Sequence, residues 1–312
     1  MNIRTYQPGD EIAQVSIYNE MAGALPHFKI ATVDEVRRRH RSHDFDPQTC
    51  LYAVADGRVV GYITYQLNGR ISYPWCRQEH RSLAEPLLQA ALEALRQRGL
   101  RQAWTAYRQD WTSIHDFFLA QGFTPSGEMI NYVLDMVDMP TPAARPALHI
   151  TPLQREDLPT VLQLGQKVLR CTDVPSLERA LFNNPYLSPA DLFILRPRSD
   201  GQPLGVCCIV SNEQYADPKQ VDSEMPCFRL GAFGTEGLTH KRIRGLFSFL
   251  VADNRDQMAL GLDLLNFACR HVESKEISTL AAQVCSTATH LNRFYNHFFR
   301  RQGSFPLFAR DL

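Results

Sequence analysis

Histidine, arginine and acidic residues gather between residues 37 and 46, where their spacing could serve metal or nucleic-acid binding. His40 and His43 stand three residues apart, a spacing at which two helical histidines can share a metal ion. The stretch has the pattern of a helix end that passes into a loop, where cations also suit the helix dipole. The three arginines that precede His40 lack interleaved aromatic residues. The pattern therefore favours a solvated helix end over a metal site or a nucleic-acid patch.

The eight cysteines show none of the spacings typical of zinc sites or redox pairs. Only Cys207 and Cys208 are adjacent, and neighbouring residues of a strand point to opposite faces. The sequence contains no Cys-x-x-Cys pair and no cysteine and histidine cluster with zinc spacing. We therefore expect a cytoplasmic protein without a bound metal, whose thiols act as small core residues.

The charge balance limits the partners that the chain attracts. Lys plus Arg and Asp plus Glu number 33 each, so the formal net charge is zero. No overall basic field exists to gather nucleic acid or an anionic membrane. The first residues do not form a signal sequence, and no apolar run reaches the length of a membrane span. We expect binding to neither nucleic acid nor membrane.

The two halves of the chain repeat one another in the same order. Four pairs of stretches carry the repeat: Ile3–Asp10 with Ile150–Asp157, Asp56-Gly57 with Asp200-Gly201, Leu87-Leu88 with Leu264-Leu265, and Phe117-Phe118 with Phe294-Tyr295. The last two pairs share one offset of 177 residues. A repeat of this length predicts two copies of a domain rather than a solenoid.

A proline-rich segment separates the two copies. Three prolines fall within residues 140–146, where they favour a stiff, extended connector over a helix or a central strand. We therefore expect a first domain over residues 1–138, a linker over 139–146 and a second domain over 147–312.

Each half has the pattern of one mixed α/β unit. The order is a strand, two helices, a hairpin, a strand, a long helix, a strand, a helix and a last strand. In the first half we expect a helix from Asp10 to Met21, a hairpin about Asp56-Gly57, a strand at Ile71–Tyr73, a helix ended by Gly99, a strand at 102–107, a helix at 112–120 and a last strand at 129–134. In the second half we expect strands at 192–195, 204–210, 245–251, 277–284 and 305–309, with the last helix at 288–299.

This order of elements, with a Phe-Tyr-type pair on the last helix (Phe117-Phe118 and Phe294-Tyr295), resembles the GNAT superfamily of N-acetyltransferases, once in each half. The resemblance covers nearly the whole chain and extends to the tandem, two-domain members of that superfamily. It implies an α/β (α+β) fold of two GNAT-like domains, each a mixed, mostly antiparallel sheet flanked by helices.

The resemblance also implies an acetyl-CoA site in the second half. The family's cofactor loop has the form Arg/Gln-x-x-Gly-x-Gly/Ala, where small residues let backbone N–H groups approach a pyrophosphate at a helix N-terminus. The matching stretch ends in Ala259 and Gly261. By this match acetyl-CoA contacts Gln257, Met258, Ala259, Leu260 and Gly261. The backbone of Phe249, Leu250 and Val251 polarises the thioester carbonyl in the family geometry.

The loop of the first half departs further from the family pattern. The same register places Ser82 and Ala84 at the small positions and supplies no glycine. An alternative alignment sets Glu79-His80-Arg81 on the family's Glu-His/Tyr-Arg stretch and shortens the loop by two residues. Both alignments make the first loop the more degenerate copy.

In this family the residue after the Phe of the last helix is commonly a tyrosine that protonates the departing CoA thiolate. The second half offers Tyr295 there, and the first half has Phe118. A phenol pKa near 10 against about 8.5 for a thiol allows that transfer. The resemblance thus implies that the second half is catalytic, although Tyr295 could also be a packed tyrosine and Ala259 and Gly261 a plain helix start. The general base stays open among Asp253, Glu224, Glu236 and His240.

We therefore expect an acyl-CoA-dependent N-acyltransferase. It moves an acetyl group from acetyl-CoA to a primary amine of a small molecule or peptide, by direct attack in a ternary complex without a metal. The protein acts as a monomer or homodimer. One alternative is a non-catalytic CoA-binding or interaction scaffold. Another is an aminoacyl transferase that uses charged tRNA, against which the balanced charge argues.

Overall fold

The computed structural model describes residues 2–26, 28, 30–41, 45–140, 148–165, 169, 171, 173–197, 201–216, 245–253, 256–273 and 275–312. Several features singled out in the sequence lie outside these ranges: His43, Asp200, residues 141–146 of the linker, and the possible bases Glu224, Glu236 and His240.

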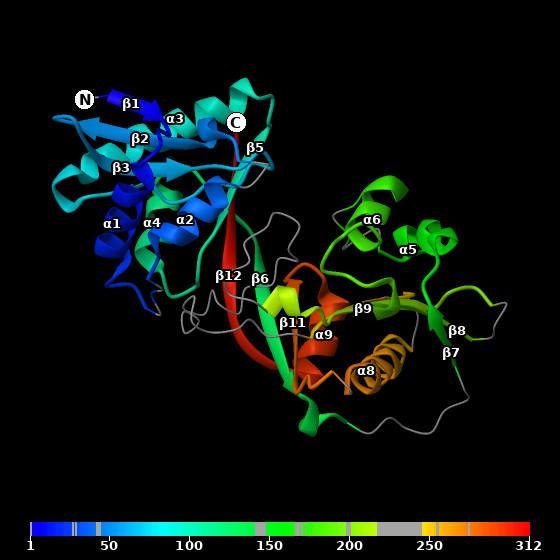
Figure 1. Ribbon diagram of the computed structural model, residues 1–312. Helices are drawn as coiled ribbons and strands as arrows, with labels where there is room; N and C mark the ends of the chain where they lie inside the picture. Colours follow the sequence, from blue (N-terminus) through cyan, green and yellow to red (C-terminus); the bar gives the residue numbers. More distant parts are fainter. Residues whose placement is uncertain are drawn as a thin grey trace.

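The first half contains a four-stranded antiparallel sheet of order β1-β2-β3-β4, with helices around it (Figure 1). Its strands are β1 (Asn2–Thr5), β2 (Cys50–Ala55), β3 (Arg58–Thr64) and β4 (Trp75–Cys76). Its helices are α1 (Asp10–Ala22), α2 (Val33–His40), α3 (Ala84–Gln97) and α4 (Thr112–Ala120). Asp56 and Gly57 have φ of 48° and 74°. Those angles suit the tight turn between β2 and β3, so the predicted hairpin is confirmed.

The second half builds most of an eight-stranded sheet. Its strands are β7 (His149–Pro152), β8 (Leu192–Arg196), β9 (Gly205–Val210), β10 (Leu246–Val251) and β11 (Thr279–Cys285). Its helices are α5 (Leu158–Gly165), α6 (Val174–Leu181), α7 (Glu213–Ala216), α8 (Gln257–Glu273) and α9 (Thr289–Phe298). Among the described residues, no helix is long and apolar enough to span a membrane.

The two halves exchange their last strands. These are β6 (Thr124–Asp135) of the first half and β12 (Arg300–Asp311) of the second, and the first half also contributes β5 (Gln102–Ala106). The larger sheet has the order β5-β12-β6-β11-β10-β9-β8-β7. Each last strand therefore pairs with the strand that precedes the last helix of the other half. Figure 1 shows β6 and β12 side by side as the bridge between the halves.

The exchange carries the C-terminal end of the chain into the first half. Phe308 on β12 is buried in the core that α3, β2 and β3 form, and Leu312 packs against the same core. The linker prediction for residues 139–146 stays a prediction. The eight-stranded sheet contains strands of both halves, so the repeat describes the order of the elements and not one matching sheet in each half.

The repeat itself is visible in matched elements. Leu87 and Leu88 of α3 and Leu264 and Leu265 of α8 are all fully buried, each pair on the long helix of its half. The prediction of a strand at Ile71–Tyr73 is wrong. Ile71 forms only an isolated bridge to Tyr65, and the strand that follows β3 is the two-residue β4. The last strands were placed correctly but are longer than the predicted 129–134 and 305–309.

Candidate functional site

In the first half, the chain segment that precedes β4 separates from β5. The N–H of Ile71 donates to Trp104 O at 2.8 Å, and the N–H of Trp104 donates to Gly69 O at 2.9 Å. Two residues further on, the N–H of Tyr73 instead donates to the side-chain hydroxyl of Tyr107, at 2.5 Å. A side chain therefore takes the place of a neighbouring strand where the two segments diverge.

Strand β4 has an open edge beside this divergence. It is the last strand of its sheet, paired on one side with β3. The N–H of Arg77 donates back to Val60 O on β3, at 2.9 Å. Because N–H groups alternate in direction along a strand, the N–H of Cys76 faces the open edge. This edge thus presents a backbone donor that β3 does not use.

A cavity of about 400 Å³ lies against this edge. Ligand cavities in proteins commonly measure roughly 300–1,000 Å³. The lining comes from the end of α1, from β4 and the residues before it, from the start of α3, and from α4. It comprises Met21, Leu25, Tyr73, Pro74, Trp75, Cys76, Arg81, Ser82, Ala84, Glu85, Ser113, Ile114, Phe117 and Gln121.

The charged part of the lining comes from the start of α3, and Ser113 and Gln121 add polar side chains from α4 and its end. A 3-10 turn over Gln78–Leu83 leads into α3 and brings Arg81, Ser82 and Glu85 to the cavity. A helix N-terminus and an arginine both favour a negatively charged ligand group such as a phosphate. Burial raises the pKa of Tyr73, and the nearby Arg81 guanidinium opposes that rise. The Tyr73 phenol is therefore protonated at neutral pH.

The apolar part of the lining includes three aromatic side chains, Tyr73, Trp75 and Phe117, which we call the aromatic wall. The ring of Tyr73 meets Trp75 at 4.9 Å and Phe117 at 5.1 Å between centroids, both edge to face. Met21 and Leu25 continue the apolar surface from the end of α1 and the chain that follows it. The cavity thus combines a polar part, with the charged side chains Arg81 and Glu85 and the Ser82 hydroxyl, and an apolar part.

The residues predicted to bind acetyl-CoA in the second half occupy the expected elements. Phe249, Leu250 and Val251 end β10 and are buried, and Gln257–Gly261 forms the first five residues of α8. Residues 254 and 255, between strand and helix, lie outside the described ranges. Asp253, the one possible base that the structure describes, accepts a hydrogen bond from Gln257 at 3.0 Å. Their role in binding acetyl-CoA stays a prediction.

Gly261 has a packing reason for its small size. A Cβ at this position would lie 2.8 Å from the ring of Phe294 and 2.9 Å from the ring of Phe249. Those two rings already contact each other edge to face, with centroids 4.5 Å apart. The glycine therefore allows α8 to approach an aromatic pair, whatever else it does.

Tyr295 lies where β10 and β11 diverge. These strands share a single register pair, Leu246 with Ala281. The phenol is 2% exposed and donates to Phe247 O at 3.3 Å. Burial raises the pKa of Tyr295 well above its usual value, so the group stays protonated. Its role as the acid in catalysis stays a prediction.

The two halves therefore differ in what lies where their strands diverge, next to β4 and β5 in the first half and between β10 and β11 in the second. In the second half Tyr295 and its aromatic neighbours pack into that divergence, with Tyr132 stacked on Tyr295 at 5.5 Å. In the first half the corresponding position is Phe118, fully buried against Tyr107, and the cavity opens beside the strand edge.

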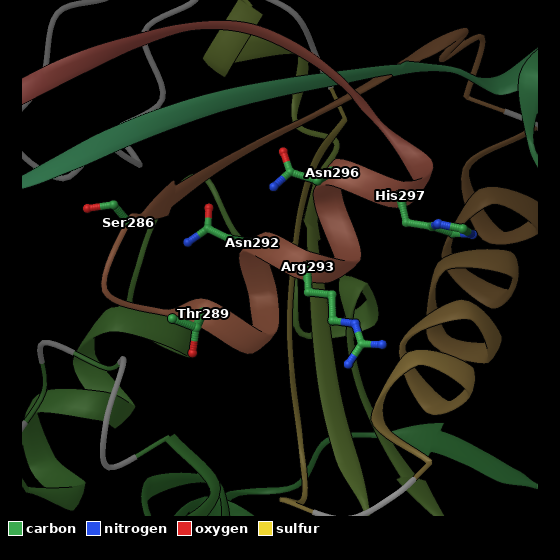
Figure 2. Close-up of a pocket in the computed structure, with 6 residues that line it drawn as sticks. All are labelled: Ser286, Thr289, Asn292, Arg293, Asn296 and His297. Atoms are coloured by element: carbon green, nitrogen blue, oxygen red, sulfur yellow. The ribbon is translucent and has the colours of Figure 1, made fainter.

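A second hollow of about 480 Å³ lies over α9 (Figure 2). Polar side chains line it: Ser286, Thr289, Asn292, Arg293, Asn296 and His297. Asn292 accepts from the Tyr132 hydroxyl at 3.1 Å and donates to Cys285 O at 2.7 Å, so its amide holds α9 against neighbouring strands. Among the residues that the structure describes, no strand edge comparable to β4 contributes to this lining.

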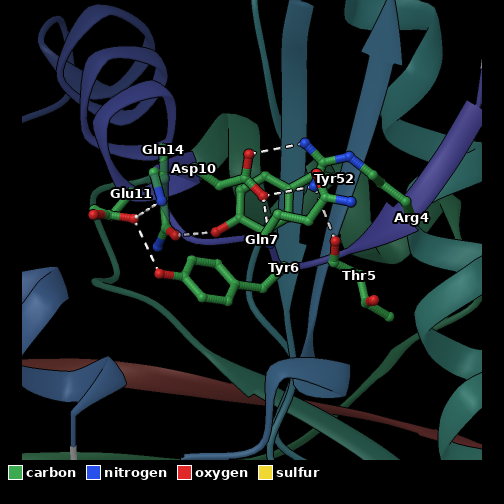
Figure 3. Close-up of polar contacts among 9 residues, drawn as sticks. Arg4, Thr5, Tyr6, Gln7, Asp10, Glu11, Gln14 and Tyr52 are labelled. Carbon is green, nitrogen blue, oxygen red and sulfur yellow. Dashed lines mark hydrogen bonds and ion pairs between the residues drawn. The ribbon is translucent and has the colours of Figure 1, made fainter.

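Two clusters of ionisable groups outside the cavities serve packing. Figure 3 shows the first, where both oxygens of Asp10 accept from Arg4, at 2.6 and 2.9 Å. In the second, Ser211 and His271 both contact the carboxylate of Asp191, at 2.5 and 2.9 Å. The serine therefore donates to the acid and not to the histidine, which is not the order of a nucleophilic triad. Among the described residues no group of three His, Cys, Asp or Glu side chains could hold a metal ion.

Sequence reasoning missed the lining of the first-half cavity. Ser82, Ala84 and Arg81 appeared only as members of a degenerate loop, and Tyr73, Trp75 and Phe117 had no assigned role. A signal was present in the close pair Tyr73 and Trp75, followed within a few residues by that loop. The contact between Tyr73 and Phe117 depends on the fold and could not be obtained from spacing.

The sequence matches no protein-family model and no curated protein. Solved structures are similar in fold. One is a GCN5-related N-acetyltransferase from Sphaerobacter thermophilus, with a TM-score of 0.64 over 99% of this chain and 95% of that chain, at 15% identity. Another is a tandem GNAT protein from the clavulanic acid biosynthesis pathway, with a TM-score of 0.52 over 99% of this chain and 98% of that chain, at 11% identity.

The chain has the GNAT fold. The predicted fold class, mixed α/β with helices flanking the sheets, is thereby confirmed. A glucosamine N-acetyltransferase region of a fungal multi-domain GH3 β-N-acetylglucosaminidase is also similar, with a TM-score of 0.67 at 14% identity. That match covers 99% of this chain and 38% of the other. The GNAT fold therefore extends over both halves of this chain.

Proposed function

We propose that the protein is an acyl-CoA-dependent N-acyltransferase and that its donor site is the cavity of the first half. The observation that carries the proposal is the meeting of three features in one cavity. They are the open edge of β4, the arginine and serine at the start of α3, and the aromatic wall. The GNAT fold adds support, because its solved examples include N-acetyltransferases.

In this proposal the phosphate groups of the donor lie at the start of α3, near Arg81 and Ser82. The pantetheine arm follows the open edge of β4, and the N–H of Cys76 polarises the thioester carbonyl. The amine nitrogen attacks the carbonyl carbon, a C–N bond forms and the C–S bond breaks. The nitrogen gives up a proton to water, and the Tyr73 phenol supplies one to the departing thiolate.

The assignment differs from the one that the family motif implies, which favours the second half. The donor needs space beside a strand edge, and the described first half offers it at β4. In the second half the matching divergence holds Tyr295, and a Cβ at Gly261 would already clash with the rings of Phe249 and Phe294. The acceptor remains a primary amine of a small molecule or peptide, as the resemblance implies.

Thermal unfolding with increasing acetyl-CoA tests the assignment, since a ligand that binds the folded state raises Tm with concentration. Ser82→Glu places a carboxylate at the polar part of the cavity and should abolish the rise by repelling the phosphates. Ala259→Glu is the matched control, because residue 259 takes the place of residue 82 in the second copy. We expect Ala259→Glu to keep the rise.

The opposite pattern, loss in Ala259→Glu and retention in Ser82→Glu, would place the donor in the second half. No rise in the parent protein would refute the donor class itself. Release of CoA thiol with a panel of amines then separates an enzyme from a binding scaffold. Tyr73→Phe should slow that release without weakening donor binding, whereas Tyr295→Phe should leave both unchanged.

A further inference from the structure

We propose that the donor carries an acyl chain longer than acetyl, and that the chain lies against the aromatic wall and the apolar end of α1. This inference rests on the proposed function. The inference concerns the length of the acyl chain that the first-half cavity prefers. The apolar side chains that surround the thioester position in the proposal support it.

Apolar side chains dominate the lining away from the start of α3. They are Met21, Leu25, Tyr73, Trp75, Ile114 and Phe117. Met21, Leu25, Tyr73 and Phe117 are only half-buried, so the cavity leaves part of their apolar surface open. An acetyl group offers one methyl to this surface, and a longer chain covers more of it. Removing that surface from water favours binding in proportion to the area covered.

The position of β4 assigns this surface to the acyl chain of the donor. In this proposal the thioester carbonyl lies at the open edge, at the N–H of Cys76. Trp75 is the preceding residue on the same strand. Tyr73 and Trp75 are two residues apart and their rings touch at 4.9 Å. An acyl chain attached to that carbonyl therefore lies against the aromatic wall. The amine then approaches the carbonyl from the side opposite the acyl chain.

Isothermal titration calorimetry with CoA, acetyl-CoA and hexanoyl-CoA measures the preference. Each fully buried CH₂ tightens binding roughly fourfold, and hexanoyl has four more CH₂ groups than acetyl, so burial of about half of them should make hexanoyl-CoA bind about tenfold more tightly than acetyl-CoA. Leu25→Asn should remove most of that difference while CoA itself binds as before. Leu119→Asn is the matched control, because Leu119 lies on α4 outside the lining and is 45% exposed.

A titration of hexylamine into the CoA complex distinguishes a donor chain from an acceptor chain. Hexylamine that binds in parent protein but not in Leu25→Asn, without a hexanoyl-CoA preference, would overturn the donor assignment. Equal affinity for acetyl-CoA and hexanoyl-CoA would overturn the inference and leave the proposed function standing. Failure of CoA and both thioesters to bind would overturn the proposed function and this inference together.

Discussion

Glu11 carries a negative charge in the interior of the first half. It is 5% exposed and accepts hydrogen bonds from Arg37 at 2.9 Å, Tyr6 at 3.1 Å and the N–H of Gly9 at 2.9 Å. Figure 3 shows the bond from Tyr6 to Glu11. Burial would raise the pKa of Glu11, but the hydrogen bonds from Arg37, the backbone and Tyr6 outweigh it and lower the pKa to about 2. The folded state therefore favours the charged carboxylate.

Replacing this residue tests that balance. The folded pKa lies below the usual value of 4.5, so the stabilisation is complete above pH 4.5 and is lost as the pH falls towards 2. Glu11→Gln should lower the free energy of unfolding at pH 7 by about 2 to 3 kcal/mol. Urea unfolding at pH 7 and at pH 3 measures the change, which should shrink at the lower pH.

A surface pair supplies the control. Glu93 contacts Arg96 at 3.3 Å and its side chain is 56% exposed. Glu93→Gln should change the free energy of unfolding by less than about 1 kcal/mol at either pH. A loss for Glu11→Gln that is the same at pH 7 and pH 3 would show that the carboxylate charge is not the cause.

At the scale of elements, β12 links the two cores. Phe308 is 6% exposed within the first-half core, with its ring 5.1 Å from that of His115 on α4. Phe305, three residues earlier on the same strand, packs instead beside Val133 and Tyr186. One strand of the second half therefore completes the core around the cavity of the first.

Truncating each phenylalanine separates the two contributions. All three tryptophans, at positions 75, 104 and 111, belong to the first half, so their fluorescence reports on that half. Phe308→Ala should lower the free energy of unfolding seen by tryptophan fluorescence by about 3 to 5 kcal/mol. Phe305→Ala, at a half-buried site in the other core, should cost less. An unchanged fluorescence transition in Phe308→Ala would contradict the observed strand exchange.

Elements of the fold were predictable where local patterns decide them. The helix at 112–120 and the hairpin about Asp56-Gly57 follow from apolar spacing and turn chemistry, and both are confirmed. The partner of each last strand was not predictable, because alternation along β12 is the same whichever half it joins. The same limit applies to the cavity, because Tyr73 and Phe117 come into contact only through the packing of α4.

At the scale of the whole molecule, the repeat and the exchange together produce a symmetric order. The central strands read β5-β12-β6-β11, and exchanging the halves turns this order into its own reverse. The strand order is symmetric, but the side chains at the two matching places are not. The first half has a cavity beside β4, and the second packs Tyr295, Phe249 and Phe294 together at the matching place. Under the proposed function, the first half binds the donor and the second half differs from it at the matching place.

Amide hydrogen exchange with and without saturating acetyl-CoA tests this assignment most directly. Bound ligand slows exchange where it restricts local opening. We expect protection in peptides that cover residues 73–85 and 113–121, at the lining of the first-half cavity. Protection confined to peptides over residues 249–261 and 289–297 would contradict it and place the donor in the second half.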